Sequence, residues 1–136
     1  MKNIAIGSGF LLFLFVGCGT NKDYVTKTMT VTVSAYNSTV AQTDGLPTLA
    51  AWSDTLVPGM KSVAVSRDLI ALGLDHNSEL EIEGLKGVYV VKDKMAARWT
   101  ERIDIYMGND VAKAREWGIQ ERKIRFRVKK EADAKK

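Results

Sequence analysis

The sequence predicts a mainly β domain that closes into a small barrel with one or two short helices. Three observations favour this fold. Short runs rich in β-branched residues, several alternating apolar with polar positions, recur along the chain. Turn-forming pairs such as Asp44-Gly45 and Pro58-Gly59 separate these runs. Only one helical pattern stands out, and there is no internal repeat of the kind that builds a solenoid.

The first expected strand alternates small polar and apolar residues with period two, as a strand with one buried face does. Gly84 and Gly87 bracket the turn of a hairpin between the third and fourth strands. Asn109 or Asp110 is expected to cap a helix that Gly118 ends. The predicted strands cover residues 28–35, 62–65, 79–83, 88–91, 103–106 and 124–128, and the helix covers 111–117.

The N-terminus resembles a bacterial lipoprotein signal. Lys2 precedes an apolar run over residues 4–16, which is shorter than the roughly 20 residues needed to span a bilayer. Cys18, the only cysteine, follows this run. We expect residues 1–17 to be removed and Cys18 to be lipidated, so that no thiol remains for a disulfide, a metal or a nucleophile. The alternative is a plain secretory signal with an incidental cysteine.

Removal of residues 1–17 from a chain of 136 leaves 119 residues, enough for one domain. We expect a lipid-anchored tether over 18–28, the barrel over 29–128 and a disordered charged tail over 129–136. The absence of Asp after Cys18 favours the periplasmic face of the outer membrane, in the cell envelope.

The net charge of +4 and the isoelectric point of 9.2 suit an anionic partner, such as a cell-wall glycan or lipid headgroups. Much of the excess lies in the C-terminal tail, which is alternatively a solvated, frayed end. Nucleic acid is not expected as a partner, because the protein is expected to be exported and has no aromatic-plus-basic binding motif. A monomer is expected.

Two carboxylates lie in apolar surroundings in the second half of the chain. Asp93 follows the run VYVVK, and Asp104 lies inside RIDIY. Strands disfavour Asp, and a buried carboxylate must be hydrogen-bonded or have a shifted pKa. Two such residues on neighbouring strands suit an acid site that cleaves carbohydrate. Alternatively, backbone amides in turns satisfy both carboxylates, which then hold a loop together.

Six sequence blocks follow one another over residues 29–128, namely MTVTVSAYNST, QTDGLPTLAAW, PGMKSVAVSRDLIALG, LEIEGLKGVYVVKD, RIDIYM and AREWGI. Their order resembles the 3D domain, named for three aspartates. This domain occurs in lytic transglycosylases of the MltA type and in stationary-phase survival proteins. The resemblance implies a six-stranded double-psi β-barrel, related to RlpA-like and expansin barrels.

The resemblance also implies an activity. The family's lytic transglycosylases cleave the bond between N-acetylmuramic acid and N-acetylglucosamine in peptidoglycan glycan strands. One aspartate protonates the leaving oxygen, and the sugar's own 6-hydroxyl closes a 1,6-anhydro ring, so no cofactor or metal is implied.

The family motifs place the acid at Asp104 and a supporting carboxylate at Asp93. The third family aspartate is replaced by Ser66, for which Asp68 is a possible substitute. Met95 and Ala96 replace two glycines of a family loop. The alternative function is therefore a non-catalytic peptidoglycan-binding or structural envelope lipoprotein.

Further residues are candidates for substrate binding. Aromatic rings in loops can stack on pyranose rings or pack within the loop. Arg102 can hold a substrate carboxylate or pair with Glu101, and Asp44 equally suits a turn. His76, the only histidine, is expected to be a solvated turn residue, so histidine triads and zinc are not predicted. The substrate-binding candidates are Tyr36, Thr43, Asp44, Trp52, Ser66, Trp99 and Arg102.

Overall fold

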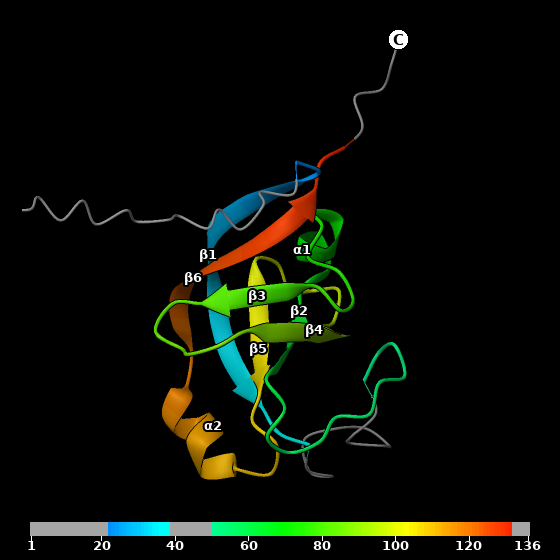
Figure 1. Ribbon diagram of the computed structural model, residues 1–136. Helices are drawn as coiled ribbons and strands as arrows, with labels where there is room; N and C mark the ends of the chain where they lie inside the picture. The colour runs from blue at the N-terminus through cyan, green and yellow to red at the C-terminus, as the bar shows by residue number, and fades with distance from the viewer. Residues whose placement is uncertain (1–21, 39–49, 132–136) are drawn as a thin grey trace, which may run out of the picture.

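The computed structural model describes residues 22–38 and 50–131, which form six strands and two short helices (Figure 1). In chain order they are β1 (Tyr24–Tyr36), β2 (Ser62–Val65), α1 (Arg67–Ala71), β3 (Glu79–Ile82), β4 (Tyr89–Lys94), β5 (Arg102–Tyr106), α2 (Val111–Trp117) and β6 (Gln120–Lys129). Neither helix of the described residues is long and apolar enough to cross a lipid bilayer.

The six strands close into a barrel in the order β1-β5-β2-β4-β3-β6. Two pairs, β1 with β5 and β2 with β4, run parallel, whereas the other neighbours run antiparallel. Every described strand has a neighbour on both sides, although residues 24–31 of β1 pair with β6 alone. This mixed sheet confirms the predicted fold, a small six-stranded double-psi β-barrel.

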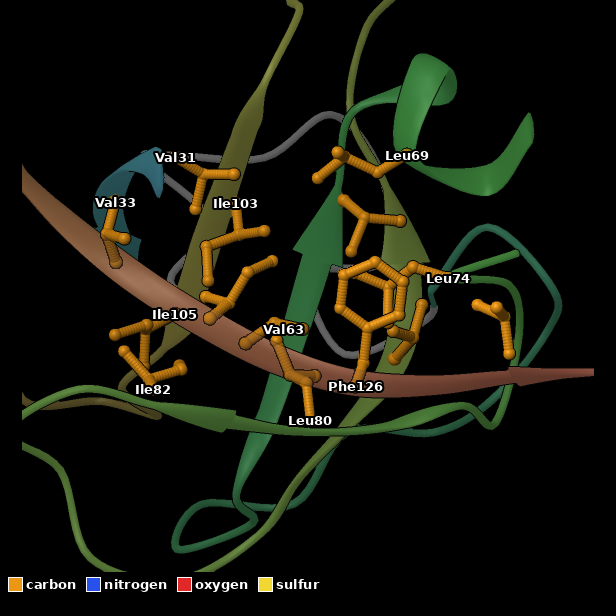
Figure 2. Packing of buried hydrophobic residues seen from close by; sticks show 14 residues of the cluster. Val31, Val33, Val63, Leu69, Leu74, Leu80, Ile82, Ile103, Ile105 and Phe126 are labelled. Atoms are coloured by element: carbon orange, nitrogen blue, oxygen red, sulfur yellow. The ribbon is translucent and has the colours of Figure 1, made fainter. Parts of the chain in front are cut away.

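Aliphatic side chains fill the barrel interior. Ile124, Phe126 and Val128 alternate with exposed basic residues along β6, so one face of that strand enters the core. Because the interior is packed with apolar side chains, polar chemistry is confined to the outer face and the ends of the barrel. The core residues labelled in Figure 2 are Val31, Val33, Val63, Leu69, Leu74, Leu80, Ile82, Ile103, Ile105 and Phe126.

The first and last strands are longer than predicted. β1 begins at Tyr24, inside the predicted tether, and pairs with β6 from Tyr24 opposite Lys129 to Val33 opposite Gln120. The backbone of Lys130, in the predicted tail, donates to the carbonyl of Asp23 at 2.7 Å. These strand ends could not be predicted from the sequence, because the paired segment extends beyond the core. Side chains there stay exposed and need not be apolar.

The two helices agree with the predicted one or two, but only α2 was assigned to residues, with its observed bounds, and the position of α1 was not predicted. Five residues are too few to show helical periodicity. In α2 the side chain of Asp110 accepts a hydrogen bond from the backbone of Lys113 at 2.9 Å, and Gly118 ends the helix at a φ of 64°. The capping signal in the sequence was therefore sufficient.

Asp110→Ala is expected to lower the free energy of unfolding by about 1 kcal/mol, because the backbone amide of Lys113 loses its acceptor. Urea denaturation followed by circular dichroism measures the change. Glu116→Ala, at an exposed position of the same helix, is the matched control and should stay within about 0.5 kcal/mol of the wild type. An equal loss in both variants would contradict the capping role.

Candidate functional site

Four neighbouring strands bring two carboxylates onto one outer face of the barrel. Asp104 on β5 is paired with Ser34 on β1 and with Ala64 on β2, and Ala64 is also paired with Asp93 on β4. The residues on either side of Asp104 are buried in the core, so its side chain faces outward. Adjacent strands lie about 4.8 Å apart, which places the two carboxylate-bearing backbones about 10 Å apart across Ala64.

A bulge in β4 determines which way Asp93 points. Val63 pairs with Val91, but the next residue, Ala64, pairs with Asp93, so Lys92 is the extra residue. Without this shift Lys92 would face outward beside Ala64, and Asp93 would share the inward face of Val91. The bulge therefore brings Asp93 to the face that carries Asp104.

Asp104 has the electrostatics of a proton donor. Burial raises the pKa of Asp104 to about 6, and the nearby Asp93 carboxylate also raises it. A hydrogen bond from Ser34 and the charge of Arg102 lower the pKa, but by less. Its Oδ1 is buried and has no hydrogen-bonding partner among the described residues. The site thus holds a carboxyl group that is protonated in mildly acidic solution and has one uncommitted oxygen.

Tyr36 presents a neutral hydroxyl to the same face, two residues after Ser34 on β1. Burial, followed by the charges of Asp93 and Asp104, raises the pKa of Tyr36 far above its ordinary value. Its hydroxyl oxygen is buried and unpartnered within the described part of the chain. Because buried polar groups are normally hydrogen-bonded, an unpaired hydroxyl and an unpaired carboxyl oxygen on one face suit a polar ligand.

The ring of Tyr106 packs beside that of Tyr36, with centroids 5.5 Å apart. Its hydroxyl is 2.8 Å from the hydroxyl of Ser38. Ala50 and Leu56 pack on Tyr106 in a second, smaller apolar cluster. The segment that follows residue 49 therefore covers part of this outer face, an arrangement that the local sequence pattern did not reveal.

Asp93 differs from Asp104 in its hydrogen bonding. Its Oδ1 accepts from the backbone amides of Ala51 at 2.8 Å and of Lys94 at 2.9 Å. The alternative in which backbone amides satisfy the carboxylate and secure a loop thus describes Asp93. It does not describe Asp104, whose Oδ1 is unpaired among the described residues.

Arg102 connects Trp99 to Asp104 through Ser34. Its guanidinium lies over the Trp99 ring, 4.1 Å from the centroid, and its Nε donates to Ser34 Oγ at 3.2 Å. Ser34 in turn hydrogen-bonds Asp104. Among the described residues Arg102 makes no ion pair with Glu101, the surface alternative considered from the sequence. Trp99 and Arg102 thus lie on the Asp104 side of the barrel.

Trp52 and His76 pack against each other in the neighbouring loops. Their rings are stacked with centroids 4.7 Å apart, and the Lys94 ammonium is 5.8 Å from the Trp52 centroid. His76 also pairs with Asp54. His76 lies in a turn, as predicted, but its ring is half-buried and held by Trp52 and Asp54 instead of being simply solvated. The face of the Trp52 ring that His76 covers is used for packing between the loops.

Ser66 is placed differently from a substrate-binding residue. It is fully buried, its Oγ accepts from the backbone amide of Arg102 at 3.0 Å, and its own amide donates to the Arg102 carbonyl at 2.9 Å. Asp68 accepts from the backbone amide of Glu101 at 2.9 Å. Both side chains hold the loop that enters β5, so the expectation that Ser66 contacts substrate is corrected. The other carboxylate oxygen of Asp68, Oδ1, is buried and has no hydrogen-bonding partner among the described residues.

Three predicted residues, Cys18, Thr43 and Asp44, lie outside the described residues. Within residues 22–38 and 50–131 no group of three or more His, Cys, Asp or Glu side chains is arranged to hold a metal ion.

No family model and no curated protein matches the sequence. Among solved structures, the Streptomyces papain inhibitor is similar over 76% of this chain and 96% of its own, with a TM-score of 0.50 and 18% identity. The apo form of an expansin from Clavibacter michiganensis is similar over 80% of this chain, with a TM-score of 0.46 and 20% identity. The matched part is 53% of the expansin chain. At such identities the similarity concerns the fold alone.

Proposed function

We propose that this protein is a peptidoglycan-acting, lytic transglycosylase-like protein with Asp104 as its general acid. The observation that carries the proposal is the Asp104 carboxyl group, which faces outward, has an unpaired buried Oδ1 and has a pKa raised to about 6. A general acid needs both a proton near the working pH and an oxygen free to deliver it. The ordered sequence blocks that resemble the 3D domain supply the substrate class.

In the proposed reaction Asp104 gives its proton to the glycosidic oxygen as the bond from that oxygen to C1 of N-acetylmuramic acid breaks. The 6-hydroxyl of the same sugar attacks C1 and closes the 1,6-anhydro ring. The proton released by that hydroxyl returns to the Asp104 carboxylate, so the acid is regenerated without water. A single acid suffices because the substrate supplies its nucleophile intramolecularly.

The surrounding residues are assigned supporting roles. The charge of Asp93 helps to keep Asp104 protonated. The Tyr36 hydroxyl, which is buried and unpartnered among the described residues, is assigned a hydrogen bond to a sugar oxygen. The guanidinium groups of Arg98 and Arg102 both lie over the Trp99 ring, and this ring is assigned the role of stacking on a neighbouring pyranose.

A second candidate function is peptidoglycan binding without turnover. Two observations favour it. Asp93 has an oxygen committed to backbone amides that fix a loop, and the position of the third family aspartate holds the buried Ser66. A barrel with these features can still bind glycan strands after it has lost its catalytic activity.

We further propose that the protein is a monomer tethered to the periplasmic face of the outer membrane by lipid on Cys18. The signal-like residues before Cys18 support this placement. The intact mass of the protein isolated from envelopes tests it, since cleavage before Cys18 and acylation change the mass in opposite directions.

Digestion of isolated peptidoglycan by the purified protein tests the proposed function. Mass spectrometry of the released muropeptides should show 1,6-anhydro products, which are one water lighter than hydrolysis products. Products with a free reducing end would contradict the transglycosylase mechanism. No products, together with co-sedimentation of the protein with the peptidoglycan, would establish the binding function instead.

A further inference from the structure

The paired ends of β1 and β6 project at one end of the barrel beside α1, and α2 lies at the opposite end (Figure 1). Lys27 Nζ donates to the Leu72 carbonyl at 3.4 Å, and a side chain on Gly73 would meet Val128 Cγ1 at 2.7 Å. The turn after α1 therefore packs against these strand ends. We call this region, residues 22–27, 72–73 and 127–131, the ribbon end.

The ribbon end exposes large apolar side chains. Tyr24 is 42% exposed, Val25 42% and Leu72 44%, whereas the interior face of the same two strands is buried further along the barrel. Exposed apolar residues gathered at one end of a small soluble domain mark a contact surface more often than isolated ones do.

Basic residues lie on both faces of the ribbon end, with Arg127 and Lys129 on the face of Tyr24 and Lys27 on the face of Val25. Within 22–27 and 127–131 the only acidic residues are Asp23 and Glu131, and no ion pair of the described residues involves the basic ones. The guanidinium of Arg127 lies 5.2 Å from the centroid of the Tyr24 ring. The ribbon end therefore combines an aromatic residue, aliphatic residues and a net positive charge. The basic residues are Lys22, Lys27, Arg127, Lys129 and Lys130.

We propose that the ribbon end docks on a lipid surface that carries anionic headgroups. Tyrosine prefers the interface between water and lipid, and lysine and arginine side chains are attracted to anionic lipids. A single acyl chain or a basic cluster binds a bilayer weakly, and the two together anchor a protein stably. The proposal uses the lipid proposed for Cys18 and is independent of glycan cleavage.

The distance along the chain is consistent with this docking. Tyr24 comes six positions after Cys18, so an extended link reaches at most about 20 Å. A lipid on Cys18 would hold the ribbon end close to the bilayer and raise its effective concentration there. The partner is therefore a membrane surface, in preference to a soluble anionic polymer.

Docking by the ribbon end would orient the catalytic face. Ser34, the strand neighbour of Asp104, lies ten residues along β1 from Tyr24, which corresponds to about 30 Å of strand. The barrel would stand on its ribbon end and hold the Asp93 and Asp104 row away from the lipid. Such a position suits a substrate that lies above the membrane surface.

Lysine footprinting of the full purified protein tests the docking. The protein is added to vesicles of phosphatidylcholine alone or mixed with phosphatidylglycerol, acetylated briefly and analysed by mass spectrometry. With anionic vesicles, Lys27 and Lys129 should react about fivefold more slowly, and high salt should restore part of the reactivity. Lys113, exposed on α2 at the far end, should react as it does without vesicles.

A charge reversal makes the test specific. Lys129→Glu should abolish the protection of Lys27, whereas Lys123→Glu, an equal charge change further along β6, should retain it. Protection of Lys113 as strong as that of Lys27, or identical footprints for both variants, would overturn the proposal. The intact mass shows whether Cys18 is acylated, and muropeptide release shows whether the protein cleaves peptidoglycan. A protein that is not acylated, or that does not cleave, can therefore be distinguished from one that does not dock.

Discussion

Asp104→Asn is expected to lower the rate of anhydro-muropeptide release by about 10² to 10⁴-fold, the range over which a positioned acid contributes to catalysis. The amide keeps the size of the carboxyl group but cannot give a proton to the glycosidic oxygen. Initial rates on isolated peptidoglycan, quantified by mass spectrometry, measure the loss. A thermal melt of both proteins shows that the variant is folded.

Asp93→Asn is the matched control for this prediction. The side-chain oxygen can still accept the backbone amides of Ala51 and Lys94, so the loop stays fixed while the charge is removed. A smaller loss of rate is expected, because Asp93 acts on Asp104 through its field. If Asp104→Asn retained the wild-type rate, or if Asp93→Asn alone removed all turnover, Asp104 would not be the acid.

The pH dependence of the rate follows from the same carboxyl group. Because the acid must be protonated and its pKa is about 6, the rate should fall about tenfold for each pH unit well above that value. The Asp93→Asn variant should lose activity from a lower pH than the wild type, since the Asp93 charge raises the Asp104 pKa. A wild-type rate that rises steadily from pH 5 to 9 would contradict the assignment.

The strand centres could be predicted from the sequence because β-branched residues mark where strands are buried. β2 and α2 have the predicted bounds, and RIDIY forms β5 with Asp104 at its centre. The ribbon end could not be predicted in this way, since Tyr24 and Lys129 pair beyond the core and carry no apolar periodicity. Apolar periodicity in the sequence indicates which residues are buried. Strands that pair outside the core have no such periodicity.

The candidate site was predictable in part. Asp104 was identified as a charge inside an apolar strand, but the direction of Asp93 depends on the bulge at Lys92, which nothing in VYVVKD indicates. The position of Ser66 depends on its contacts with Arg102, a residue far away in the sequence. The unpaired hydroxyl of Tyr36 is likewise visible only once β1 and β5 are paired.

Asp104→Asn is also expected to stabilise the protein at pH 8 by about 3 kcal/mol while leaving its stability near pH 4 almost unchanged. The pKa of Asp104 is about 6 in the folded protein and near its ordinary value of 3.8 when unfolded. Between these values the folded state binds more protons than the unfolded state, so this group makes stability fall as pH rises, until the cost is complete above about pH 6. Asn has no charge to desolvate and avoids that cost.

Urea unfolding of the wild type and the variant at pH 4 and pH 8 measures this effect as a difference of differences, in which the other titrating groups cancel. Glu116→Gln, which removes an exposed carboxylate from α2, is the matched control and should reproduce the wild-type change between the two pH values. A variant that is less stable than the wild type at pH 8 would show that the Asp104 carboxylate is satisfied in the fold. A more stable variant without turnover would mean that the barrel tolerates a destabilising carboxyl group for its chemistry, as functional sites commonly do.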